Sequence, residues 1–151
     1  MYFFAPGFFW PGTLVAVALL GLVTRQAPRL RTACGLGAVF GLALLLPSVS
    51  WQLLLTPEAY LGLVALEVPF YAALGGALHL TGRRRSAALW AAGAWTTIES
   101  AFSSWPFGGF GWMRLGFAMV DSPLAGLFPL LGTVGVSLAT ADGLELDLPP
   151  L

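Results

Sequence analysis

The sequence predicts an all-α membrane protein, a polytopic bundle of about five transmembrane helices. Of its 151 residues, 58% are hydrophobic and only 9% are charged, whereas soluble domains carry about 25% charged residues. A soluble fold with so few charges would expose large apolar patches and would aggregate. The apolar residues also gather in runs that are long enough to cross the roughly 30 Å hydrocarbon core of a bilayer. Lipid is therefore expected to surround most of the protein.

Five apolar runs are expected to cross the membrane as helices, because the backbone polar groups find no water in lipid and must bond within their own segment. None of the runs alternates in polarity, as the strands of a membrane β-barrel do. One transmembrane domain is thus expected over residues 1–141, and residues 142–151 are expected to be a short acidic tail or the point where a longer chain is interrupted, with interruption favoured. The expected spans cover residues 8–23, 33–55, 61–80, 87–102 and 124–141.

The segments between the runs set these boundaries. Pro11 suits the first turn of the first span, and the polar stretch 24–32 follows that span. A Thr-Pro-Glu turn at 56–58 separates the second span from the third. The third span ends at the basic loop 81–86, where cations favour the C-terminus of a helix. The loop 103–123 then lies between the fourth and fifth spans.

The arginines predict the orientation of the chain. Arg25, Arg29 and Arg31 form one cluster and residues 83–85 form a second. Two spans separate the clusters, so both lie on one side of the membrane, and basic loops are retained in the cytoplasm. The sequence therefore predicts a multi-pass protein with loops 24–32 and 81–86 in the cytoplasm and loop 103–123 outside it.

Composition argues against several functional classes. The formal net charge is zero, and no basic face is present for a nucleic-acid partner. The chain has one cysteine, Cys34, and one histidine, His79, which lie far apart in the sequence. This pair argues against a metal site, and a single cysteine cannot form a disulfide within the chain. No metal and no cofactor are expected.

Two acids within the spans, Glu67 and Glu99, are candidates for function. A charged residue at the centre of a membrane helix costs about 2.5–3.5 kcal/mol on insertion scales, so such residues face a cavity or a partner. Glu67 is expected near the outer interface. Glu99 shares helical spacing with Thr96 and Ser103, which places hydroxyls beside its carboxylate. This face forms either a functional polar cavity or a structural hydrogen-bond cluster, and the sequence leaves both open.

Glycine and aromatic residues mark two further features. Gly37 and Gly41 form a GxxxG pair, which either brings two helix backbones together or reflects how common glycine is in membrane helices. The outer loop combines glycines with large rings, which either form an interfacial aromatic girdle or shape a groove for acyl chains. Together with Glu99, the candidate lipid-contacting or substrate-contacting residues are Trp105, Phe107, Gly108, Gly109, Phe110 and Trp112.

Five short segments stand out: WTTIE at 95–99, PFGGFGW at 106–112, LG at 115–116, SPL at 122–124 and GTVGVS at 132–137. Together they resemble the apolipoprotein N-acyltransferase family. The likeness is specific over residues 95–137 and weaker before them, where a Trp-Pro helix start, an arginine-rich loop and a glycine-rich helix ending in Trp51 follow the family pattern. The chain departs from that pattern at Gly111, where the family usually has proline, and at Phe102, where it usually has arginine.

The resemblance implies a membrane enzyme of the bacterial inner membrane. The family transfers an acyl chain from phospholipid to the N-terminal cysteine of bacterial lipoproteins, through a Glu–Lys–Cys triad on a nitrilase-like domain. This chain has no lysine, so none of its residues is expected to be catalytic, and the chain alone is expected to be inactive. The phospholipid and, in the full-length family, the lipoprotein are the expected partners. The alternatives are a small membrane transporter or channel using Glu67 and Glu99, and a non-enzymatic membrane scaffold.

Overall fold

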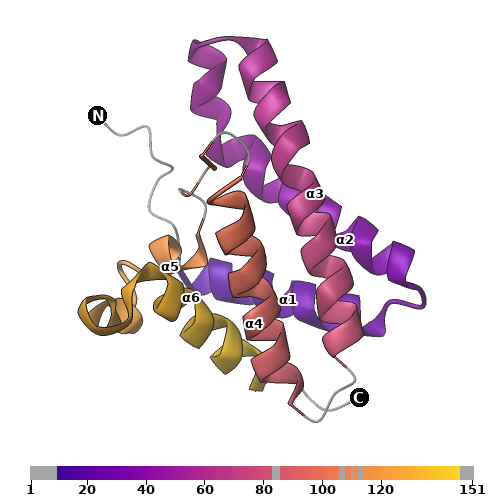
Figure 1. Cartoon of the computed structure of the whole chain (residues 1–151), viewed down its shortest axis with the longest axis vertical. Helices are drawn as coiled ribbons and strands as arrows, with labels where there is room; N and C mark the ends of the chain where they lie inside the picture. Colours follow the sequence, from indigo (N-terminus) through magenta and orange to yellow (C-terminus); the bar gives the residue numbers. More distant parts are fainter. Residues whose placement is uncertain (1–9, 83–85, 106–107, 110, 112–113, 147–151) are drawn as a thin grey trace.

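A computed structural model of the chain describes residues 10–82, 86–105, 108–109, 111 and 114–146, with only the backbone described for 142–146. Every regular element among these residues is helical, which confirms the predicted all-α class (Figure 1). The elements are α1 (Trp10–Gln26), α2 (Leu30–Ser48), the 3₁₀ helix η1 (Ser50–Leu54), α3 (Pro57–Thr81), α4 (Ala87–Phe102), α5 (Leu115–Ala118), the 3₁₀ helix η3 (Pro123–Leu127) and α6 (Phe128–Leu146).

Three helical segments are long and apolar enough to cross a membrane. They are α2 with 19 residues, α3 with 25 residues and the segment Pro123–Ala141 with 19 residues. The expected spans 8–23 and 87–102 correspond to the shorter helices α1, with 17 residues, and α4, with 16. At 1.5 Å per residue, α4 is roughly 24 Å long, less than the roughly 30 Å of hydrocarbon. The chain is thus a membrane helical bundle in which the expected number of five spans is approximate.

The second expected span differs most from the helix found. We expected one segment over 33–55, whereas α2 ends at Ser48 and the chain continues as the 3₁₀ helix η1. Pro47 lies in the last turn of α2, where its ring opposes the carbonyl four residues earlier and supplies no N–H group. Hydropathy alone carries no signal for this break, and Pro47 is the residue of the run that marks it.

Two hydrogen bonds form at the turn between α2 and α3, and one of them joins the two helices. The hydroxyl of Thr56 accepts from the backbone N–H of Ala59 at 3.1 Å and so caps α3. The hydroxyl of Tyr60 donates to the carbonyl of Leu46 at 2.9 Å. Figure 1 shows α2 and α3 antiparallel and side by side, with α4 next to α3 and α6 beyond α4.

Glycines allow α2 and α3 to touch along their backbones. A Cβ atom placed on Gly37 would clash with the carbonyl oxygen of Tyr71 and would lie 3.0 Å from the Cα of Gly75. A Cβ atom on Gly41 would lie 2.7 Å from the Cβ of Tyr71. The GxxxG pair is therefore a helix–helix contact, the first of the two readings that the sequence left open.

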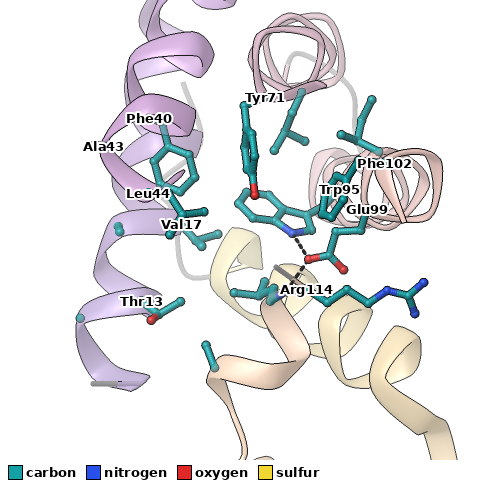
Figure 2. Close-up of a pocket in the computed structure, with 16 residues that line it drawn as sticks. Thr13, Val17, Phe40, Ala43, Leu44, Tyr71, Trp95, Glu99, Phe102 and Arg114 are labelled. Atoms are coloured by element: carbon teal, nitrogen blue, oxygen red, sulfur yellow. Dashed lines mark hydrogen bonds between the residues drawn. The ribbon is translucent and has the colours of Figure 1, made fainter. Parts of the chain in front are cut away.

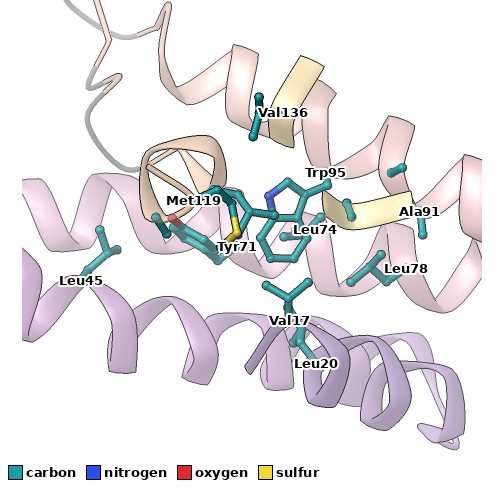
Figure 3. Packing of buried hydrophobic residues seen from close by; sticks show 14 of the residues in the cluster. Val17, Leu20, Leu45, Tyr71, Leu74, Leu78, Ala91, Trp95, Met119 and Val136 are labelled. Carbon is teal, nitrogen blue, oxygen red and sulfur yellow. The ribbon is translucent and has the colours of Figure 1, made fainter. Parts of the chain in front are cut away.

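The core lies where these helices meet α5 and α6. Buried side chains from α1 to α4 pack with Met119, which follows α5, and with Val136 of α6 (Figure 3). Large apolar residues are also exposed on the outer faces of the helices, among them Val39 and Leu130. Such faces suit contact with lipid, where apolar side chains need no burial within the protein. The labelled core residues of the first four helices are Val17, Leu20, Leu45, Tyr71, Leu74, Leu78, Ala91 and Trp95.

Candidate functional site

Glu99 joins α4 to α5 from a buried position. It lies in the last turn of α4 and only 5% of its surface is exposed. Its Oε1 atom accepts a hydrogen bond from the indole N–H of Trp95, one turn earlier, at 2.8 Å. The same atom accepts from the backbone N–H of Leu115, the first residue of α5, at 2.6 Å (Figure 2). The first N–H groups of a helix lack partners within the helix, so Glu99 satisfies a group that would otherwise be buried without an acceptor.

A hydroxyl of α6 accepts a hydrogen bond from the next N–H group of α5. The backbone N–H of Gly116 donates to the hydroxyl of Ser137 at 2.9 Å, and Ser137 is fully buried. A Cβ atom on Gly116 would lie 2.6 Å from the carbonyl oxygen of Thr133, so α5 and α6 approach closely. The first two N–H groups of α5 are thus held from opposite sides by α4 and α6.

Arg114 adds a third link just before α5. Its Nε atom donates to the hydroxyl of Ser103 at 3.0 Å, and its Nη1 atom lies 3.4 Å from the hydroxyl of Thr133. The guanidinium group therefore bridges the end of α4 and the first turns of α6. Together, the links of Glu99, Ser137 and Arg114 fix the chain where it returns from the loop that follows α4.

The two adjacent glycines of the loop are required by its backbone. Gly108 has φ 91° and Gly109 has φ 77°, a left-handed region that side chains disfavour. A Cβ atom on Gly109 would clash with the backbone of Ser103. The loop thus folds back onto the end of α4, and a plain aromatic girdle has no need for such a turn.

Aromatic rings connect this loop to the core. Trp105 is 67% exposed and contacts Phe70 edge-on, with ring centroids 6.3 Å apart. Phe70 contacts Phe102, which stacks on Tyr71 at 6.0 Å. Phe40 then bridges Tyr71 and Trp95. These contacts form a continuous network of rings from Trp95 to Trp105. Each such contact contributes about 0.5–1.5 kcal/mol beyond burial.

A cavity of about 420 Å³ lies beside these groups (Figure 2). Its walls come from α1, α2, α3, α4 and α5, and most of its lining is apolar. Polar groups line it at Thr13, Tyr71, Glu99 and Arg114, and Ala43 is both a lining residue and exposed at the surface. Its size falls within the range of about 300–1,000 Å³ that is common for ligand sites, and a few polar groups in apolar walls are typical of such sites.

The structure distributes the predicted site residues unevenly. Glu99 lines the cavity, and Trp105, Gly108 and Gly109 belong to the loop beside it, whereas Phe107, Phe110 and Trp112 lie outside the described residues. The expected pairing of Glu99 with hydroxyls on its own helix is not observed. The hydroxyl of Thr96 donates to the carbonyl of Ala92, and that of Ser103 accepts from Arg114.

Glu67 lies in α3 and is only 2% exposed. It does not line the cavity. Sequence reasoning missed Tyr71 and Ser137, whose roles depend on residues far away in the chain. In the part of the chain that the structure describes, no three His, Cys, Asp or Glu side chains are grouped to hold a metal ion.

Comparison with known proteins identifies the family. Residues 1–141 match the domain described as the apolipoprotein N-acyltransferase N-terminal domain. The chain is 34% identical to the apolipoprotein N-acyltransferase of Azotobacter vinelandii over 97% of its length, and 33% identical to that of Ralstonia nicotianae over 88%.

These matches cover 31% and 28% of the two relatives, so the chain spans less than a third of the proteins that it resembles. No solved structure gives a significant match. On the domain match and the extent of these identities, the chain belongs to the apolipoprotein N-acyltransferase family and carries its N-terminal membrane domain.

Proposed function

We propose that this chain is the membrane domain of a protein that transfers an acyl chain from a membrane phospholipid to the N-terminal cysteine of bacterial lipoproteins. The observation that carries the proposal is the match of residues 1–141 to the family's N-terminal domain. The names of the relatives supply the reaction and the acceptor. The geometry agrees with a lipid-handling role, because an apolar cavity lies beside a loop that three polar links hold in place.

The outer loop is the part of the domain that we assign to lipid contact. Trp105 is largely exposed while its other ring edge packs on Phe70, an arrangement that suits a ring at the level of the lipid headgroups. Gly108 and Gly109 turn the loop back towards Ser103. Phe107, Phe110 and Trp112 are included in the proposal on the strength of the sequence.

We expect the chain by itself to be inactive in acyl transfer. The family resemblance implies a Glu–Lys–Cys triad, while the chain has no lysine and its single cysteine, Cys34, lies in the first turns of α2. Purified chain in detergent, supplied with phospholipid and a lipopeptide with a free N-terminal cysteine, should yield no N-acylated product by mass spectrometry. A full-length relative serves as the positive control. Turnover by the purified chain above the protein-free blank would contradict the proposal.

The proposed location is the bacterial inner membrane, with loops 24–32 and 81–86 in the cytoplasm and loop 103–123 outside. The two arginine clusters support this orientation, because basic loops of membrane proteins are retained in the cytoplasm. In a Cys34→Ser background, the exposed positions Gln26 and Asp121 can each be changed to cysteine. A membrane-impermeant maleimide should label Asp121→Cys in intact spheroplasts and Gln26→Cys only after lysis. Labelling of both before lysis would exclude the orientation.

A further inference from the structure

We propose that the end of the bundle where α1 and α3 terminate and α2 begins binds the headgroup of an anionic phospholipid through Arg29 and Arg31. The proposal is independent of the proposed function, because it needs no acyl transfer and concerns the end of α3 that lies away from the loop after α4. Three features carry it: the contacts between the helix ends, the uncompensated charge of two arginines and the exposed leucines beside them.

Contacts between α1 and α3 hold this end together. The Nδ1 atom of His79, in the last turn of α3, lies 3.0 Å from the carbonyl oxygen of Thr24 in α1. A Cβ atom on Gly82, the residue that follows α3, would lie 2.5 Å from the Cγ atom of Arg25. Residues 27–29 then join α1 to α2. The start of α2 is therefore held beside the end of α3, as Figure 1 also shows.

Two arginines at this end carry charges that no helix end compensates. Arg25 and His79 lie in the last turns of α1 and α3, where cations are favourable. Arg29 and Arg31 lie instead at the start of α2, whose first turn holds no acid, and the positive end of a helix dipole disfavours cations. Both side chains are exposed, and neither bonds or pairs with a residue that the structure describes. An anion from outside the chain would supply the missing negative charge.

The acidic side chains that the structure describes lie elsewhere. Glu67 and Glu99 are buried within the bundle. Glu58 begins α3 at its far end, and Asp121 follows α5. Three further arginines, residues 83–85, follow Gly82 in the sequence and lie outside the described residues, so the proposed site does not include them.

Exposed leucines place the two arginines at the level of lipid headgroups. Leu30, between them in the sequence, is 44% exposed, and Leu80, in the last turn of α3, is 62% exposed. Both belong to one region of the surface, since a Cβ atom on Gly76, one turn before Leu80, would lie 3.4 Å from the Cδ1 atom of Leu30. Leucines suit the acyl chains, whereas long arginine side chains extend towards the phosphates.

The charge of this region favours a lipid with a net negative charge. A zwitterionic headgroup would bring its own cation close to the two guanidinium groups, where like charges repel. The headgroup of phosphatidylglycerol carries a phosphate and no cation. Each arginine near an anionic lipid surface strengthens the attraction by roughly fivefold (about 1 kcal/mol).

Photo-crosslinking tests the proposal on the unmodified chain. The protein is placed in nanodiscs that contain phosphatidylglycerol or phosphatidylcholine with the same diazirine near the ester end of one acyl chain, and the adducts are mapped by mass spectrometry. Adducts on Leu30 and Leu80 are compared with those on Leu54 and Leu55, which are 78% and 67% exposed at the turn between α2 and α3. This ratio should be several-fold higher with phosphatidylglycerol. Equal ratios for the two lipids would overturn the proposal.

Matched variants test the role of the two arginines. Arg29→Gln combined with Arg31→Gln should lower the phosphatidylglycerol ratio several-fold and leave the phosphatidylcholine ratio unchanged. Arg29→Lys combined with Arg31→Lys keeps both charges and should keep the preference for the anionic lipid. Circular dichroism checks that each variant keeps its helix content. An unchanged preference in the glutamine variant would refute the assignment to these residues.

Free phosphate and the acids at the end of α6 are the competing partners. Inorganic phosphate shares the charge of the headgroup but has no acyl chain to contact the leucines. If phosphate removed the lipid preference and chloride at the same ionic strength did not, the site would bind free phosphate and the lipid assignment would fall. If Asp142 and Glu145 of α6 already neutralised the arginines, the unmodified chain would show no preference between the two lipids.

Discussion

Replacing Gly37 by alanine is expected to lower the free energy of unfolding by about 2–3 kcal/mol or more, the upper range for overpacked sites. The added methyl group would clash with the carbonyl oxygen of Tyr71 and lie 3.0 Å from the Cα of Gly75. Both contacts are with backbone, which cannot rotate away as a side chain can. α2 and α3 would have to separate along their whole interface. Titration of the detergent-solubilised protein with SDS, followed by circular dichroism, measures the loss.

Gly35 provides the control on the same helix. A Cβ atom placed there has no neighbour within 4 Å, so Gly35→Ala should leave stability unchanged or raise it by up to about 1 kcal/mol through higher helix propensity. On α3, Gly75 and Gly62 form a second such pair, since only the Cβ of Gly75 would clash with the backbone of Ala33. Equal losses at Gly35 and Gly37 would show that the close contact does not stabilise the fold.

Glu99→Ala is expected to lower the free energy of unfolding by about 2–6 kcal/mol, because two buried donors would each lose their acceptor at about 1–3 kcal/mol. These donors are the indole N–H of Trp95 and the backbone N–H of Leu115. The loss is local to the returning loop, so trypsin should also cleave faster after Arg114, which lies next to the released N–H group. Glu99→Gln keeps one acceptor oxygen and should lose less. SDS titration and the rate of tryptic cleavage measure the two effects.

Thr97→Ala on the same helix separates this effect from a general weakening of α4. Thr97 is exposed and its hydroxyl bonds only the carbonyl of Gly93 in its own helix. Its removal should change stability by no more than about 0.5 kcal/mol and leave the tryptic rate unchanged. If Glu99→Ala and Thr97→Ala gave the same tryptic rate, the carboxylate would have no part in holding the loop.

The all-α class and the membrane location could be predicted from composition and run length, because both depend on how many apolar residues follow one another. The end of α2 was missed because run length alone was weighed, whereas Pro47 in the last turn of the helix is a sequence signal for its end. α5 was also missed. It has four residues, too few for a periodic pattern, and it lies within what the sequence marks as a loop.

Glu99 was selected from the sequence and lines the cavity, but its hydrogen-bond partners were not predicted. Helical spacing pointed to hydroxyls on α4, whereas the acceptor atom binds a backbone N–H group 16 residues further along the chain. Tyr71 was missed for a similar reason. Its importance comes from Phe40, Phe102 and the cavity, which a single sequence does not place beside it. Periodicity reports neighbours on one helix, and the site is built from contacts between helices.

The two N–H groups that Glu99 and Ser137 hold belong to the main chain, not to the side chains of Leu115 and Gly116. An anchor of this kind fixes the path of the polypeptide without reading which residue stands at position 115. Any apolar amino acid that fits the core offers the same amide to the carboxylate, and proline alone offers none. Replacing Leu115 by another apolar residue that fits the core is thus expected to keep the hydrogen bond to Glu99.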